Sequence, residues 1–261
     1  MKSNLRNFNK FKIIILAGGY GTRLKSTLGE TPKVLAPINK KPFIDWLISW
    51  INSWEICSNK NIILSTCIGH EKIQKYCLER KYQVNCIREK VPLGTFGAIA
   101  NVATRSFADD YIIINGDTIF KANLKDIAEK YKSHKSKTPL ILLKKKKIKN
   151  EGGYIKNKNN WIYSNDLAEY ISLGTFFISY ESLKSRWIKA TNKNFENKII
   201  NQDYNKKYMI DKDCFGKNPI NAVTLNSDIP FIDIGSPKAY KTSQNYIPKI
   251  IEELIVKDNI F

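Results

Sequence analysis

Residues 12–24 read KIIILAGGYGTRL, a short apolar run followed at once by a loop rich in glycine. A β-branched run of this length that stops at glycine is typical of a strand buried on both faces. Glycine lets the backbone of the loop come close to a bound group, because no Cβ stands in the way. We therefore expect a buried strand over 12–16 whose loop lies at the carboxyl end of a sheet, where open α/β folds collect ligands.

Downstream of this loop, helix-like and strand-like segments alternate. The apolar residues Phe43, Trp46, Leu47, Trp50 and Ile51 repeat at spacings of three and four, which predicts an amphipathic helix whose tryptophans belong to the core. By the same reasoning we predict strands over 61–67, 82–88 and 111–114, and helices over 71–80, 96–105 and 124–131. This order favours a parallel sheet with helical crossovers.

Past Pro139 the pattern changes to short strands separated by polar turns. Strands are predicted over 140–143, 154–155, 161–163, 171–178, 221–225 and 231–234, and a helical segment over 237–256. The polar, lysine-rich stretch 192–213 predicts a surface insertion or mobile loop. Because strands here no longer alternate with helices, the second half is expected to make the sheet mixed.

The composition predicts a folded protein with a strong basic bias. Of 261 residues, 43% are hydrophobic, and 43 basic against 24 acidic side chains give a net charge of +19. The lysines are scattered, and the one cluster, 144–147, follows a strand-like run, so a solvated strand end is favoured over a polyanion site. No apolar stretch approaches the ~20 residues of a membrane span or the ~7 of a signal-peptide core. We expect a cytoplasmic protein with no nucleic-acid or membrane partner.

Cysteine and histidine offer little to catalysis. The five cysteines form no C-x-x-C pair, which argues against a zinc site or a disulfide framework, and reduced buried thiols are favoured. Only His70 and His134 are present, so the sequence offers little for histidine-based triads or multi-histidine metal sites. The chemistry therefore depends on Asp, Glu, Lys, Arg and the backbone.

The glycine loop is a candidate phosphate cradle. Its backbone N–H groups can surround an anion, and the guanidinium of Arg23 is suited to phosphate oxygens. A dinucleotide-binding fingerprint is excluded because Leu24 stands where its last glycine belongs, and a P-loop is excluded because no Gly-Lys-Ser/Thr closes the loop. From these residues alone, a tight turn with no ligand remains the alternative.

Further motifs make the chain similar to the sugar-1-phosphate nucleotidyltransferases. The loop is followed by PKVLAP at 32–37, PLGT at 92–95, NGD at 115–117 and FIDIG at 231–235, in the order of that family. The resemblance covers about 12–240. Within the family, the chain most resembles bacterial guanylyltransferases that act on mannose 1-phosphate or D-glycero-D-manno-heptose 1-phosphate.

The resemblance implies a Rossmann-like three-layer α/β/α fold, similar to glycosyltransferase A, with a mixed, mostly parallel central sheet. It implies a single domain over 1–261, with a nucleotide-binding half at about 11–120, a sugar-phosphate-binding half at about 121–240 and a C-terminal helical segment at 241–261. The expected reaction joins a nucleoside triphosphate, GTP in the first instance, to a sugar 1-phosphate for surface glycan synthesis. A UTP or CTP enzyme, or a catalytically impaired nucleotide-binding homologue, remains open, as does a homo-oligomer.

The resemblance also assigns site residues. Arg23 and Lys33 would be catalytic, and Asp117 and Asp233 would bind Mg²⁺, whereas a turn aspartate and a structural salt bridge are their respective alternatives. The nucleotide would be bound by Leu16, Ala17, Gly18, Gly19, Gly21, Thr22, Glu89, Pro92, Gly94 and Thr95. The sugar phosphate would be bound by Gly153, Glu169, Ser172 and Gly174.

Two departures from the family pattern bear on substrate binding. Phe96 occupies a place that is usually small, beside the expected nucleobase. The stretch 162–172 lacks the Glu-Lys pair whose lysine contacts the sugar phosphate in relatives, since no lysine follows Glu169. Sugar-phosphate binding is then expected to depend on Lys33 or on a lysine from elsewhere, or to be weakened.

Overall fold

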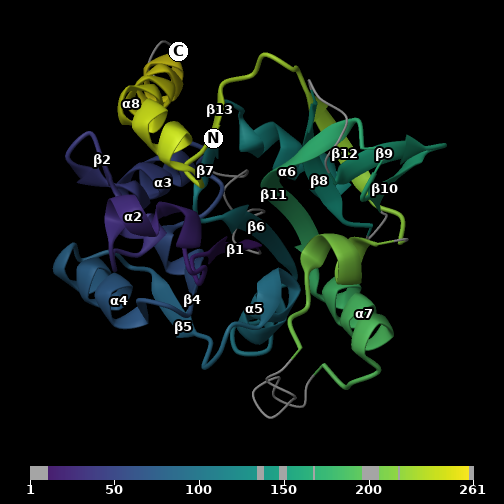
Figure 1. Cartoon of the computed structure of the whole chain (residues 1–261). Helices are drawn as coiled ribbons and strands as arrows, with labels where there is room; N and C mark the ends of the chain where they lie inside the picture. The colour runs from purple at the N-terminus through teal and green to yellow at the C-terminus, as the bar shows by residue number, and fades with distance from the viewer. Residues whose placement is uncertain are drawn as a thin grey trace.

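A computed structural model describes residues 11–133, 138–146, 152–166, 168–195, 206–216 and 218–258. Among these residues, nine strands form the main sheet (Figure 1). Four of them are parallel to one another: β1 (Phe11–Leu16), β4 (Ile62–Thr66), β5 (Asn85–Arg88) and β6 (Asp110–Asn115). The other five are β8 (Leu140–Lys145), β9 (Gly153–Asn157), β10 (Asn160–Ser164), β11 (Tyr170–Ser179) and β12 (Asn221–Leu225).

The sheet runs without interruption through both predicted halves. Its main path is β10-β9-β11-β6-β1-β4-β5, and β8 joins β11 to β12. The change of direction lies between β6 and β11, which pair antiparallel with Thr175 opposite Ile114. The predicted mixed sheet is confirmed, and its parallel part contains the strand that carries the glycine loop.

Both faces of β1 are buried, which explains its unbroken apolar run. Ile13 and Ile15 belong to one core cluster and Ile14 to the other, as alternation along a strand requires. The first cluster includes residues of α3 (Phe43–Asn52), α4 (His70–Glu79), α6 (Leu124–Ser133) and α8 (Pro237–Asp258). The second includes residues of α5 (Gly94–Ala103) and α7 (Tyr180–Thr191). Helices therefore cover both faces, and the predicted three-layer fold is confirmed.

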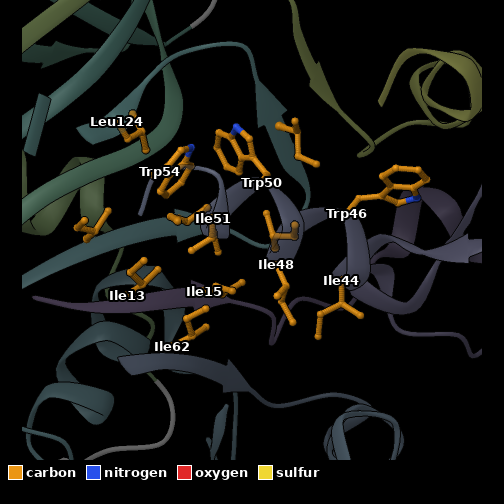
Figure 2. Packing of buried hydrophobic residues seen from close by; sticks show 14 of the residues in the cluster. Ile13, Ile15, Ile44, Trp46, Ile48, Trp50, Ile51, Trp54, Ile62 and Leu124 are labelled. Carbon is orange, nitrogen blue, oxygen red and sulfur yellow. The ribbon is translucent and has the colours of Figure 1, made fainter. Parts of the chain in front are cut away.

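The tryptophans of the α3 region are core residues, as predicted. Trp50 and Trp54 are fully buried, with ring centroids 4.5 Å apart in an edge-to-face arrangement. Figure 2 shows both indoles beside Ile51 and Leu124, over the strand that carries Ile13 and Ile15. This packing fixes one side of the strand that leads into the glycine loop.

Several elements were not expected from the pattern, among them a helix and a short strand. Helix α7 follows β11 directly, with the Ser179 side chain accepting a hydrogen bond from the Ser182 N–H at its start. It has few apolar residues, and only Leu183 and Trp187 are buried, so its periodicity is weak. The strand predicted over 231–234 is present as β13 (Phe231–Asp233), but its partner β7 (Thr118–Phe120), with which it forms a separate two-stranded sheet, was not predicted, because so short a strand shows no period.

Of the predicted surface insertion or mobile loop over 192–213, Asn192, Asn194, Lys206 and Lys207 are exposed, but the prediction is wrong for Phe195, Tyr208 and Ile210, which are buried. Residues 196–205 lie outside the described part, as do residues 1–10, His134 and Lys147. Tyr208 and Ile210 are buried in the core between α5 and α7, and the π-helix η5 (Ile210–Phe215) adds the buried Cys214 and Phe215. The lysines around these few apolar residues hid them in the sequence pattern.

Lys144 is tied to the fold rather than simply solvated. Its ammonium donates a hydrogen bond to the Ile229 carbonyl at 3.0 Å and lies 5.7 Å from the centre of the Phe231 ring.

Within the described residues, no helix is long and apolar enough to cross a membrane.

Phe96 packs into the core. Its ring is fully buried, 5.2 Å from the ring of Trp187, so it supports the first turn of α5 from behind. We expect Phe96→Ala to lower the free energy of unfolding by about 3–5 kcal/mol, because it leaves a cavity. Denaturant unfolding measures this, and Phe96→Leu should lose much less. A loss below about 1 kcal/mol for the alanine variant would contradict this packing.

Candidate active site

The site lies where β1 and β6 end at the same edge of the sheet. The Gly116 N–H donates a 3.0 Å hydrogen bond to the Leu16 carbonyl, which joins the two loops. A Cβ at Gly116 would lie 2.6 Å from that carbonyl oxygen, so only glycine allows this approach. Asp117 is thereby placed beside the glycine loop.

A cavity of about 310 Å³ opens between these loops, large enough for a small-molecule ligand. Ten predicted residues line it: Leu16, Ala17, Gly18, Gly19, Lys33, Glu89, Pro92, Gly94, Thr95 and Asp117. The other residues of its wall are Tyr20, Val34, Ala98, Asn115, Gly116, Lys207 and Met209. The cavity therefore joins the loops of the first half to a segment of the second.

The four charged residues assigned to catalysis and metal binding come together in one cluster, of which Lys33 and Asp117 line the cavity, whereas Arg23 and Asp233 lie next to them outside its wall. The Lys33 ammonium donates to Asp117 Oδ2 at 2.7 Å. The Gly235 N–H donates to Asp233 Oδ1 at 2.5 Å, and a Cβ at Gly235 would lie only 2.9 Å from Arg23 Nη2. Two cations and two carboxylates thus form one cluster.

The electrostatics of Asp233 reflect this crowding. Burial raises the pKa of its carboxyl, and the negative charge of Asp117 raises it further, while Lys33 and Arg23 act in the opposite direction. Two neighbouring carboxylates in a partly buried place repel each other. Additional positive charge between them would therefore be favourable.

The two-stranded sheet of β7 and β13 brings the two aspartates together. Asp233 pairs with Thr118 across β13 and β7, and the Ile234 N–H donates to the Asp117 carbonyl at 2.9 Å. These backbone contacts bring the late FIDIG motif to the end of β6. A long-range strand pair, and not local sequence, builds the acidic end of the site.

The two carboxylates fit a magnesium ion only as part of a shared site. Among the described residues, no group of three or more His, Cys, Asp or Glu side chains could hold a metal. Mg²⁺ is commonly bound by one or two carboxylates with substrate phosphates and waters completing its six oxygens. Asp117 and Asp233 provide that donor set and no more.

Glu89 shapes the loop that follows it. Its Oε1 accepts a hydrogen bond from Ser65 Oγ at 3.1 Å, and its Oε2 accepts one from the Leu93 N–H at 3.0 Å. Burial raises the pKa of this carboxyl. Gly94 then turns with a φ of +76°, where a Cβ would lie 2.5 Å from the Tyr208 carbonyl. The conformation of the 92–95 loop is therefore held from both sides.

Several predicted residues lie away from the cavity wall. Gly21 and Thr22 continue the loop towards Arg23, with the Leu24 N–H closing on the Gly21 carbonyl at 2.9 Å. Among the sugar-phosphate candidates, Gly153 packs against the Tyr170 carbonyl and Glu169 is exposed.

The other two sugar-phosphate candidates lie on β11. Ser172 Oγ accepts from the Gly174 N–H at 3.0 Å, and a Cβ at Gly174 would lie 2.6 Å from Asn115 Nδ2. Gly174 is thus next to Asn115, which lines the cavity. Of the four candidates, it is the one that the structure brings beside the cavity wall.

Lys207 and Met209 line the cavity, although the sequence analysis assigned them to a surface loop. Their neighbours Tyr208 and Ile210 are buried. The short apolar run at 208–210 within a lysine-rich stretch was the available signal, but it is shorter than the window in which periodicity is informative.

Comparison with known proteins defines the class. The Nucleotidyl transferase family model matches residues 12–249, so the chain belongs to this family of enzymes. A D-glycero-alpha-D-manno-heptose 1-phosphate guanylyltransferase of Aneurinibacillus thermoaerophilus is 32% identical over 91% of this chain and 99% of its own length. A protein of the same name from Campylobacter jejuni is 37% identical over 49% of this chain and 56% of its own.

Solved structures agree with this assignment. The crystal structure of HddC from Yersinia pseudotuberculosis complexed with GMP-PN has a TM-score of 0.67 at 26% identity, and the match covers 89% of this chain and 97% of that one. The predicted family and fold are confirmed.

Proposed function

We propose that this nucleotidyltransferase transfers GMP from GTP to a D-glycero-D-manno-heptose-type or mannose-type 1-phosphate, with Mg²⁺, and so supplies a nucleotide sugar for surface glycan synthesis in the cytoplasm. The name of the Aneurinibacillus relative supports the sugar and the base. The guanine nucleotide analogue in the HddC crystals supports the base. The observation that carries the proposal is the cluster of Arg23, Lys33, Asp117 and Asp233 at the glycine loop.

The reaction requires two polyanions to meet. An oxygen of the sugar 1-phosphate forms a bond to the α-phosphorus of GTP, and the bond from that phosphorus to the α–β bridging oxygen breaks. Pyrophosphate leaves with the bonding electrons. There is little covalent work for the protein, so positioning and charge neutralisation provide most of the acceleration.

Each part of the cluster then has a role. The backbone N–H groups of the glycine loop hold the triphosphate, and Arg23 stabilises the negative charge that builds on the phosphates during transfer. Lys33 draws the sugar phosphate towards the α-phosphate. Before substrates arrive, its ammonium is held by Asp117 at 2.7 Å, so it is already oriented at the reacting end of the cavity.

Asp117 and Asp233 would hold the magnesium ion. When bound, the ion supplies positive charge that offsets the repulsion between the reacting phosphates. The positive charge of the ion would also offset the repulsion between the two carboxylates, which, in addition to burial, raises the pKa of Asp233. The 92–95 loop would surround the base together with Glu89, whose hydrogen bonds to Ser65 and Leu93 fix the conformation of that loop.

A second candidate function, nucleotide binding without catalysis, is suggested by the residues expected to bind the sugar phosphate. The missing Glu-Lys pair, and the position of Gly153, Glu169 and Ser172 away from the cavity wall, would also suit a homologue that binds nucleotide without turnover. A UTP- or CTP-dependent enzyme is the close alternative within the family.

One assay separates these functions. The protein is incubated with each of ATP, GTP, CTP and UTP, Mg²⁺ and a set of sugar 1-phosphates, and pyrophosphate release is measured. We expect release with GTP and a heptose or mannose 1-phosphate, at least about tenfold faster than with any other pair. Pyrophosphate release with only CTP or UTP would show that the enzyme uses that nucleotide and not GTP. Nucleotide binding with no pyrophosphate release from any pair would favour the binding homologue.

A further inference from the structure

The segment 207–210 forms a second wall of the nucleotide cavity through Lys207 and Met209. The Tyr208 N–H donates to the Leu93 carbonyl at 2.9 Å, and the Phe96 N–H donates to the Tyr208 carbonyl at 2.9 Å. The Ile210 N–H donates to Thr95 Oγ1 at 2.9 Å. The segment is therefore fastened by its backbone to the loop at 92–95, which lines the cavity from the other side.

The side chains of this segment alternate. Tyr208 and Ile210 are buried in the core with α5 and α7, whereas Lys207 and Met209 line the cavity. Successive residues of an extended segment point to opposite sides, so the buried anchors determine the direction of Lys207. Its orientation follows from packing and does not depend on a bound ligand.

Lys207 lines the cavity beside the glycine loop, next to Tyr20 in space. Its Nζ lies 5.8 Å from the ring centre of Tyr20, which stands between Gly19 and Gly21 and is 57% exposed. No carboxylate in the described part of the chain forms an ion pair with it. An ammonium with only a ring face as partner retains most of its capacity to bind an anion.

We propose that Lys207 binds a phosphate oxygen of the bound nucleoside triphosphate, as a cation contributed by the second half of the chain. This inference rests on the proposed function, because it names a further residue of the same site. Tyr20 keeps the ammonium over the loop before the nucleotide binds. Since Lys207 lies on the nucleotide side, it does not replace the lysine missing from the sugar side.

The matched pair of variants is Lys207→Met and Lys206→Met. Both remove one charge from adjacent, exposed positions, but Lys206 lies 5.1 Å from the Tyr208 ring and outside the cavity wall. A change common to both reflects the general field of the protein, and a change confined to Lys207→Met reflects contact. Thermal unfolding of both variants confirms that they are folded.

Calorimetric titration with GTP and with guanosine, in Mg²⁺, measures the contact. We expect Lys207→Met to weaken GTP binding about tenfold, which is about 1.4 kcal/mol, and to leave guanosine binding unchanged. Lys206→Met should bind both within about twofold of the wild type. In turnover, the KM for GTP should rise for Lys207→Met while the KM for the sugar phosphate stays constant.

Other results would overturn the inference. Equal losses for GTP and guanosine would mean that Lys207 contacts the nucleoside, and equal losses in the two variants would mean a general charge effect. If the wild-type protein turns over and Lys207→Met binds GTP as tightly as the wild type, Lys207 does not bind the phosphates, and the proposed function stands. A wild-type protein that binds GTP without turnover would contradict the proposed function alone, whereas one that binds no triphosphate would contradict both.

Discussion

Arg23→Ala is expected to lower kcat about a thousandfold while the fold stays intact. The guanidinium lies beside Gly235 in the charged cluster with Asp233, Lys33 and Asp117, where the phosphates would react. A charged donor aimed at developing negative charge contributes on the order of 10²–10³ or more in rate. Because Arg23 is exposed, its removal leaves no cavity in the core. Steady-state pyrophosphate release measures the effect.

Lys25→Ala is the control for Arg23. Lys25 carries the same charge two residues away, and its ammonium pairs with Glu30 at the surface at 3.3 Å. Exposed ion pairs contribute little to stability, so this variant should keep near-wild-type turnover. An Arg23 variant with near-normal kcat would remove the residue from its proposed role.

Asp117→Ala is expected to reduce turnover below detection, with a loss of at least about a thousandfold. The change removes one of the two proposed magnesium ligands and also the partner of Lys33, whose ammonium lies 2.7 Å from Asp117 Oδ2. Without it, Lys33 loses its orientation and Asp233 is the remaining carboxylate of the pair. Positioned charge of this kind accounts for several kcal/mol of transition-state stabilisation.

Two further variants make the test of Asp117 specific. Asp117→Asn keeps the shape and one acceptor oxygen but not the charge, and should be nearly as inactive as the alanine variant. Asp228→Asn changes an exposed carboxylate in the turn before β13 and should be active. Thermal unfolding checks that all three are folded. Retained turnover in Asp117→Asn would show that the carboxylate charge is not required.

The first half of the fold could be predicted from the sequence because its signals are local. The run at 13–15 is buried on both sides of β1, and the tryptophans of the α3 region repeat at helical spacing and pack as expected. The motif at 115–117 ends a buried strand, which places Asp117 at the sheet edge without any knowledge of the rest of the chain.

What the sequence left open depends on contacts between distant segments. Asp233 meets Asp117 only because β13 pairs with β7, both three residues long. Lys207 reaches the cavity because the backbone of Tyr208 is hydrogen-bonded to Leu93 and Phe96, more than a hundred residues earlier. Helix α7 was missed because tertiary packing of Trp187 against Phe96 stabilises it, and its own periodicity is weak.

The most direct test of the central claim follows the α-phosphorus itself. Wild-type protein is incubated with Mg²⁺, a heptose 1-phosphate and GTP labelled with ³²P at the α position, and the products are separated. The account predicts that the label appears in a nucleotide sugar, with an equal amount of unlabelled pyrophosphate, and that EDTA stops both. Label recovered as free GMP or GDP, or GTP that binds and remains unconverted with every sugar phosphate, would contradict it.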